Sequence, residues 1–124
     1  MIQVYYRGSC GSSKQAFSWF EKYNIDVQKQ NISKITKRDL YKLLQISDGG
    51  LKDITKRQEK SGDKVKKALS YMELLSFNEA LNFLLSHPYV LQSPIIMDEY
   101  NYLIGYNEDE IRIFLPKEYR RCRI

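Results

Sequence analysis

Cys10 is the residue best placed to do chemistry in this sequence. A β-prone run over residues 2–6 stops at Gly8, and small residues then lead into a helix that Ser12 or Ser13 could cap. A thiol at a helix start meets unpaired N–H groups and the positive end of the helix dipole, and both favour its anion. We therefore expect an accessible Cys10 with a lowered pKa. A small apolar residue at a turn is the simpler structural interpretation.

A dithiol site would require a second cysteine at the spacing Cys-x-x-Cys, and Ser13 stands at that position. A local disulfide is therefore excluded. The Ser13 hydroxyl can instead donate a hydrogen bond to the Cys10 thiolate and lower its pKa. Arg7, three residues before Cys10, adds positive charge. The only other cysteine, Cys122, lies within a basic run near the end of the sequence.

The composition bounds the class of protein. The chain has 124 residues, with 20 Lys and Arg against 15 Asp and Glu, and the excess is concentrated in residues 52–67 and 117–123. A positive face suits nucleic acid or an acidic protein, but no DNA-reading motif is visible. No apolar run approaches the ~20 residues of a membrane span. We expect a cytoplasmic protein with no membrane partner and predict no metal or cofactor.

The elements around Cys10 form a strand, helix, strand unit. Residues 2–6 predict a buried strand, residues 14–23 a helix with a broad apolar face, and residues 25–32 an alternating second strand. A right-handed crossover of this kind makes the two strands parallel neighbours in one sheet. The first quarter of the chain thus indicates an α/β fold.

Helices are predicted in the middle of the chain. Thr36 caps the first, which ends at Ser-Asp-Gly-Gly over residues 47–50. Residues 51–67 are charged, with a turn or helix start at 61–63. A capping box of Ser76 and Glu79 opens another helix, which His87 ends before a proline. His87 more simply terminates this helix than serves as a base for Cys10.

The last third predicts a hairpin and a final helix. Residues 93–98, entered through Pro94, pair antiparallel with residues 102–104, and Asn107 caps a helix that ends before Pro116. This order is that of a thioredoxin-like fold, a single domain over residues 1–124 with a helical insertion between the second and third strands at roughly 34–87 and a basic tail at 117–124. In that architecture the proline faces the first helix, so we predict a cis bond before Pro94.

Three segments resemble the arsenate reductase (ArsC) family, and specifically its Spx branch. They are the strand leading to S-C-x-x and a lysine, the run H-P-Y-V-L-Q-S-P-I-I-M-D, and G-Y-N-E-D-E-I-R-I-F-L-P. The resemblance runs nearly end to end. It implies a transcriptional regulator that binds the C-terminal domain of the RNA polymerase α subunit and alters promoter choice under thiol-oxidative stress. It also implies that promoter DNA is reached only through the polymerase and that an ATP-dependent protease or its adaptor removes the protein.

The resemblance also assigns contact residues. Gly49 takes the place of a family glycine in the α-subunit contact, with Gly50 beside it, and Arg57 matches the arginine that follows. We group Lys52 with them. A glycine without Cβ lets a partner backbone approach closely, although a helix C-cap explains Gly49 at least as well.

The chain departs from the family at the thiol. Cys10 and Pro94 match, but Ser13 stands in place of the second redox cysteine, giving CxxS, and Gln92 and Ser93 replace arginines that stabilise an anion there. We expect a regulator rather than an enzyme, and a monomer when free. The alternative is a monothiol arsenate reductase or glutaredoxin-like oxidoreductase using Cys10, and a third option is a paralogue that has lost both functions.

Overall fold

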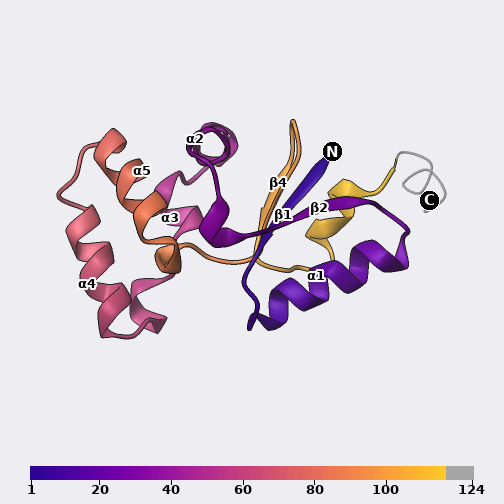
Figure 1. Ribbon diagram of the computed structural model, residues 1–124, viewed down its shortest axis with the longest axis horizontal. Helices are drawn as coiled ribbons and strands as arrows, with labels where there is room; N and C mark the ends of the chain where they lie inside the picture. Colours follow the sequence, from indigo (N-terminus) through magenta and orange to yellow (C-terminus); the bar gives the residue numbers. More distant parts are fainter. Residues whose placement is uncertain (117–124) are drawn as a thin grey trace.

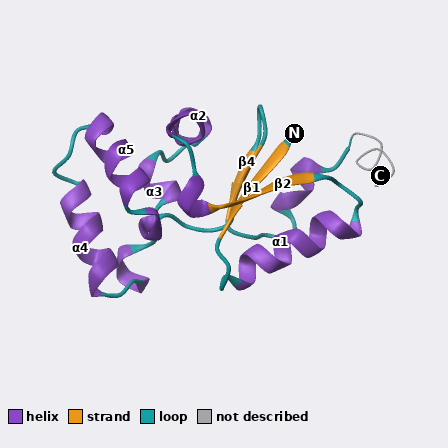
Figure 2. Cartoon of the chain, in the orientation of Figure 1, coloured by secondary structure: helices purple, strands orange, loops and turns teal. Residues whose placement is uncertain are grey.

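The computed structural model describes residues 1–116, which form a mixed four-stranded sheet with helices on both faces (Figures 1 and 2). The strand order is β2-β1-β3-β4. The strands are β1 (Ile2–Tyr6), β2 (Val27–Asn31), β3 (Ile95–Met97) and β4 (Tyr102–Ile104). β1 pairs parallel with β2, while β3 pairs antiparallel with both β1 and β4. The predicted parallel pair and hairpin are therefore confirmed, and the strand that leads to Cys10 is central.

One face of the sheet packs against α1 (Gly11–Lys22) and the short 3₁₀ helix η4 (Glu110–Phe114). Successive strand residues point to opposite faces, so Val4 of β1 and Ile96 of β3 meet this side. Ala16 and Phe20 of α1 and Ile111 of η4 complete a core whose members are almost fully buried. The apolar face predicted for the first helix is thus the surface that covers the sheet.

The other face carries the helices that lie between β2 and β3 in the chain, which Figure 1 shows gathered on the far side of the sheet from α1. They are η1 (Ile32–Lys34), α2 (Lys37–Ile46), α3 (Leu51–Ile54), η2 (Gln58–Lys60), α4 (Asp63–Met72), α5 (Phe77–Ser86) and η3 (Pro88–Val90). Leu40, Leu43 and Leu84 pack with Tyr5 and Ile95 of the sheet. None of the helices in residues 1–116 is long and apolar enough to span a bilayer.

The predicted caps of the middle helices are confirmed. The Thr36 hydroxyl accepts the Asp39 N–H at 3.1 Å, and Ser76 and Glu79 form a complete capping box at the start of α5. His87 is the C-cap of α5, and its Nδ1 lies 2.9 Å from the Phe83 carbonyl. His87 therefore ends a helix, as the sequence predicts.

The predicted starts of the first and the last helix were wrong. Cys10 itself, not Ser12 or Ser13, is the N-cap of α1, because its N–H bonds to the Arg7 carbonyl at 3.0 Å and closes the turn earlier. The final helix was predicted to be capped by Asn107, but it is a 3₁₀ helix that begins at Glu110 with Asp109 as its N-cap. The Asn107 Oδ1 accepts the N–H groups of residues 109 and 110 at 2.9 Å, so its side chain stabilises a turn that precedes the helix.

The second strand begins at Val27 rather than at residue 25. The Ile25 N–H donates to the Phe20 carbonyl at 2.9 Å and so belongs to the end of α1. The bond between Ser93 and Pro94 is cis, as predicted. The basic tail over 117–124, with Cys122, lies outside the described residues.

Candidate functional site

The thiol of Cys10 lies where the central strand β1 turns into α1. Gly8 and Ser9 form the turn, and Cys10 begins the helix. Its side chain is partly exposed and is a free thiol. The structure thus places a reachable sulfur at a helix start, and the interpretation of Cys10 as a small apolar filler does not describe it.

The pKa of Cys10 is lowered. Burial opposes ionisation and raises the pKa, but hydrogen bonds that favour the thiolate outweigh this, first from the hydroxyls of Ser13 and Ser93 and then from the N–H groups of Ser13 and Ser12. The Ser93 hydroxyl lies 3.3 Å from the sulfur, and the protonated thiol can donate to the Ser93 carbonyl at 3.6 Å. Ser13, only 1% exposed, is a fixed donor. Ser13 thus lowers the pKa of Cys10 as predicted, and Ser93, which the resemblance marks only as the replacement of an arginine, lowers it as well.

The guanidinium of Arg7 holds Ser93 beside the sulfur. It donates to the carbonyls of Pro88 and Leu91 at 2.9 and 3.2 Å and to the Ser93 hydroxyl at 3.2 Å. Burial lowers the pKa of Arg7, while the nearby Cys10 thiolate raises it. Both terminal nitrogens are committed to protein acceptors. Arg7 therefore positions the segment 88–93 instead of presenting an unoccupied cation to a substrate.

Lys56 is a residue near the thiol that sequence analysis missed. Burial lowers the pKa of its ammonium, and the Arg7 cation lowers it further, while the Cys10 thiolate opposes both. The Lys56 N–H donates to the Val90 carbonyl at 2.9 Å, and the preceding residue forms an isolated antiparallel bridge with Leu91. This backbone pairing brings Lys56 to the thiol. No local motif signals a pairing between segments so far apart in the chain.

Gly49 and Gly50 form a corner between α2 and α3. Gly50 has φ +63°, a conformation that favours glycine, and is the N-cap of α3. The Gly49 N–H donates to the Asp53 carboxylate at 2.8 Å, and a Cβ added to Gly49 would collide with that carboxylate. Because the C-cap of α2 is Ser47, the interpretation of Gly49 as a helix C-cap is wrong.

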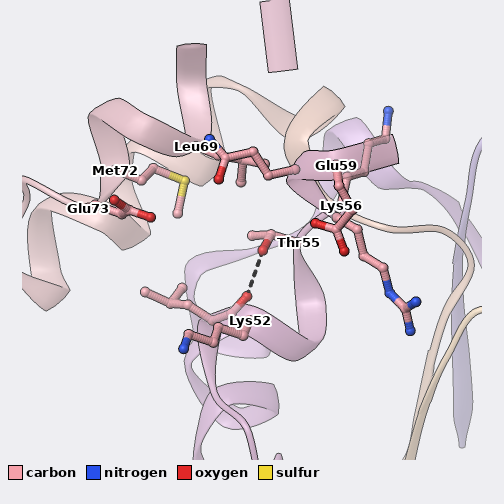
Figure 3. Close-up of a pocket in the computed structure, with 10 residues that line it drawn as sticks. Lys52, Thr55, Lys56, Glu59, Leu69, Met72 and Glu73 are labelled. Carbon is pink, nitrogen blue, oxygen red and sulfur yellow. Dashed lines mark hydrogen bonds between the residues drawn. The ribbon is translucent and has the colours of Figure 1, made fainter. Parts of the chain in front are cut away.

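Lys52 and Arg57 continue the corner as exposed cations. We call Gly49, Gly50, Lys52 and Arg57 the docking corner. Both cations line a pocket of about 530 Å³ between α3 and α4, in which Leu69 and Met72 of α4 supply apolar surface (Figure 3). Charges of both signs surround this pocket, because two glutamates line it with the cations.

The thiol site and the end of α3 beside the docking corner are separate, but both are contacted by one segment, residues 92–93. On one side of this segment, the Ser93 hydroxyl contacts the Cys10 sulfur. On the other, the Gln92 side-chain amide donates to the carbonyls of Asp53 and Thr55 at 3.3 and 2.8 Å, and its N–H donates to the Ile54 carbonyl at 2.9 Å. Adjacent residues therefore hold the sulfur and the end of α3.

The other sequence-based candidates lie elsewhere. Arg57 of the docking corner lines a second pocket as well, together with Asp53 and Gln92. The His87 ring stacks on Phe83 at 4.0 Å between ring centres. Cys122 falls outside the described residues.

Comparison with known proteins agrees with this architecture. The family model described as "ArsC family" matches residues 5–114. The "Global transcriptional regulator Spx" of Streptococcus mutans is 34% identical over 123 residues, which are 98% of this chain and 88% of that protein. "Global transcriptional regulator Spx 1" of Lactococcus lactis is 36% identical over 126 residues, covering 100% and 96% of the two chains.

A solved structure, "Arsenate reductase from Vibrio cholerae", superposes with a TM-score of 0.73 over 92% of this chain and 97% of that one, at 15% sequence identity. At this identity the likeness concerns the fold alone. It supports the predicted α/β thioredoxin-like fold.

Proposed function

The chain belongs to the ArsC family, and we propose that within it the protein acts as an Spx-like global transcriptional regulator. Support comes from relatives of that name that match nearly the whole chain at 34% and 36% identity. In this proposal the protein works in the cytoplasm, is a monomer when free, and is removed by an ATP-dependent protease or its adaptor.

The geometry of Arg7 is the observation that carries a regulator in preference to an enzyme. Reduction of an oxyanion such as arsenate needs cations that converge on the attacking sulfur. Here the Arg7 terminal nitrogens bond to two main-chain carbonyls and to Ser93. Gln92 and Ser93 stand where the resemblance expects arginines, and both side chains hold protein groups. Of the two cations near the thiol, Arg7 and Lys56, Arg7 thus serves the fold more than a substrate.

The proposed partner is the C-terminal domain of the RNA polymerase α subunit, bound at the docking corner. Gly49 is exposed, and because the Asp53 carboxylate occupies the space where a Cβ would lie, a side chain added at Gly49 must displace that carboxylate. Lys52 and Arg57 are exposed cations of the same corner. Close approach of a partner backbone at such a point excludes bulk, so a long side chain there blocks binding. Promoter DNA is then reached through the polymerase complex.

Oxidative or thiol stress acts, in this proposal, first on Cys10, which has Ser13 instead of a second cysteine beside it. The thiolate attacks a low-molecular-weight disulfide, forming one sulfur–sulfur bond and releasing one thiolate, or is oxidised by peroxide to a sulfenic acid with loss of water. In a third route the Cys122 thiol attacks the oxidised Cys10 sulfur and forms a disulfide bridge, releasing water from the sulfenic acid or the low-molecular-weight thiolate from the mixed disulfide. An added group on the sulfur displaces the Ser93 hydroxyl, and the neighbouring Gln92 transmits that shift to the end of α3.

A pull-down with the purified C-terminal domain of the α subunit tests the proposal. Wild type should bind, and Gly49→Arg should lose most of the binding because arginine fills the approach to the corner and displaces Asp53. Gly8→Arg is the matched control, since a Cβ there meets nothing within 4 Å. Thermal unfolding of each variant checks its fold. Equal binding by wild type and Gly49→Arg, or no binding by wild type, contradicts the proposal.

A second function, monothiol oxidoreductase, is favoured by one observation, the lowered pKa of a partly exposed Cys10. Nucleophilic thiol chemistry needs only a thiolate and access. Arsenate turnover with glutathione or glutaredoxin that disappears in Cys10→Ser would place this function ahead of the regulator.

A further inference from the structure

A basic hollow lies beside the edge strand β2, away from both the thiol and the docking corner. It has a volume of about 720 Å³ and is bounded by β1, β2 and the start of α2. The amide side chains of Gln3, Gln28 and Gln30 line it from the two strands. The register pairs Gln3 with Gln28, so these amides share one face of the sheet. This part of the sheet face is polar, whereas the rest of the same face is covered by the helical core.

The charge of the hollow is positive. Lys34 and Arg38 line it and are both exposed. Asp39 also lines the hollow, and its carboxylate accepts a hydrogen bond from the Tyr5 hydroxyl. The Lys29 ammonium lies over the Phe17 ring, 4.7 Å from its centre, and so belongs to the opposite face of the sheet. The exposed cations Lys34 and Arg38 thus outnumber the single carboxylate of Asp39, and the hollow favours a negatively charged ligand.

The backbone beside the hollow is an open strand edge. β2 pairs with β1 on one side, and within residues 1–116 no strand lies on its other side. Its sequence, V-Q-K-Q-N, contains no proline, and residues 28–31 are exposed. Such an edge offers outward N–H and C=O groups to which another extended chain can bond.

We propose that β2 and the basic hollow bind an extended acidic segment of a partner protein, which adds to the sheet as a strand beside β2. Main-chain hydrogen bonds to β2 hold the segment, and every second side chain points to the face that carries Gln28 and Gln30. Acidic residues at those alternate positions meet Lys34 and Arg38. This surface is independent of the docking corner, so a partner bound here leaves Gly49 accessible.

Fluorescence polarisation with labelled synthetic peptides of about eight residues tests this proposal. The probe alternates glutamate and valine, and a second peptide alternates lysine and valine. A third alternates glutamate and proline, which keeps the charge but removes half of the backbone donors and resists a strand conformation. The first peptide should bind wild type, and the other two should bind at least about tenfold more weakly.

The variant Lys34→Glu/Arg38→Glu should weaken binding of the glutamate–valine peptide about tenfold, because two attractive charge contacts become repulsive. Lys66→Glu, an exposed charge reversal on α4, is the control and should bind nearly as wild type does. Amide chemical shifts of residues 27–31 should move on binding. Equal binding of the proline peptide overturns strand addition, and equal loss in Lys66→Glu, or no binding by wild type, overturns the site.

Discussion

Replacing Ser93 with alanine should raise the pKa of Cys10 and so reduce the fraction of thiolate near neutral pH about tenfold. The Ser93 hydroxyl donates to the sulfur at 3.3 Å, and a donor that faces a thiolate stabilises the charged form. A hydrogen bond to a charged group contributes about 1.5–3 kcal/mol. The lower end applies here because sulfur is a weak acceptor and the site is partly open to water. A loss of about 1.4 kcal/mol lowers the ratio of thiolate to thiol about tenfold at a given pH, which gives the expected change.

The rate of alkylation by iodoacetamide, measured from about pH 5 to about pH 10, reports this pKa because only the thiolate reacts. A Cys122→Ser background confines the reaction to Cys10. Below both midpoints the Ser93→Ala rate should be about threefold lower than that of the parent, because about tenfold less thiolate is present while each thiolate reacts about threefold faster. At the alkaline plateau it should be about threefold higher, since thiolate nucleophilicity rises with pKa. Opposite changes at the two ends of the profile distinguish a pKa shift from altered access.

Ser9→Ala is the matched control, because Ser9 is an exposed residue of the same turn. It should leave the profile unchanged. Arg7 retains its bonds to the carbonyls of Pro88 and Leu91 when the Ser93 hydroxyl is removed, so the melting temperature should change little. An unshifted midpoint in a folded Ser93→Ala protein would refute the reasoning.

Three further measurements follow from the structure. The stability of wild type relative to Cys10→Ala should rise with pH, because the pKa of Cys10 is lower in the folded state than in the unfolded state. The stabilisation by the Cys10 thiolate is complete above the unfolded-state pKa of about 8.5 and is lost as the pH falls through the folded-state pKa. Urea unfolding at about pH 6 and about pH 9.5 measures it, and a pH-independent difference contradicts it. Gly50→Ala should lower the free energy of unfolding by about 1 kcal/mol because φ is +63°, while Gly8→Ala should change it by less than about 0.5 kcal/mol; equal effects would count against the strain. Ser76→Ala should cost about 1 kcal/mol through loss of the capping box, and Ser86→Ala, near the other end of α5, should cost less in the same unfolding assay; the reverse order is the contrary result.

Local sequence patterns predicted much of this fold because their physics acts within a few residues. The Thr36 cap, the Ser76 and Glu79 capping box, the antiparallel hairpin and the parallel pairing of β1 with β2 are all confirmed. The errors lie at element ends. The start of α1 moved to Gly11, and the last helix became a short 3₁₀ helix, because single hydrogen bonds at turns decide such boundaries.

The sequence by itself placed Cys10 at a helix start with Ser13 as a donor, since strand, turn and helix are contiguous there. The surroundings of the sulfur were decided only by the tertiary structure. Ser93 and Lys56 reach it through pairings between distant segments, and Arg7 bonds to carbonyls whose position depends on the whole chain. No short-range pattern encodes such contacts, because they form only when the sheet and the helical layer pack together.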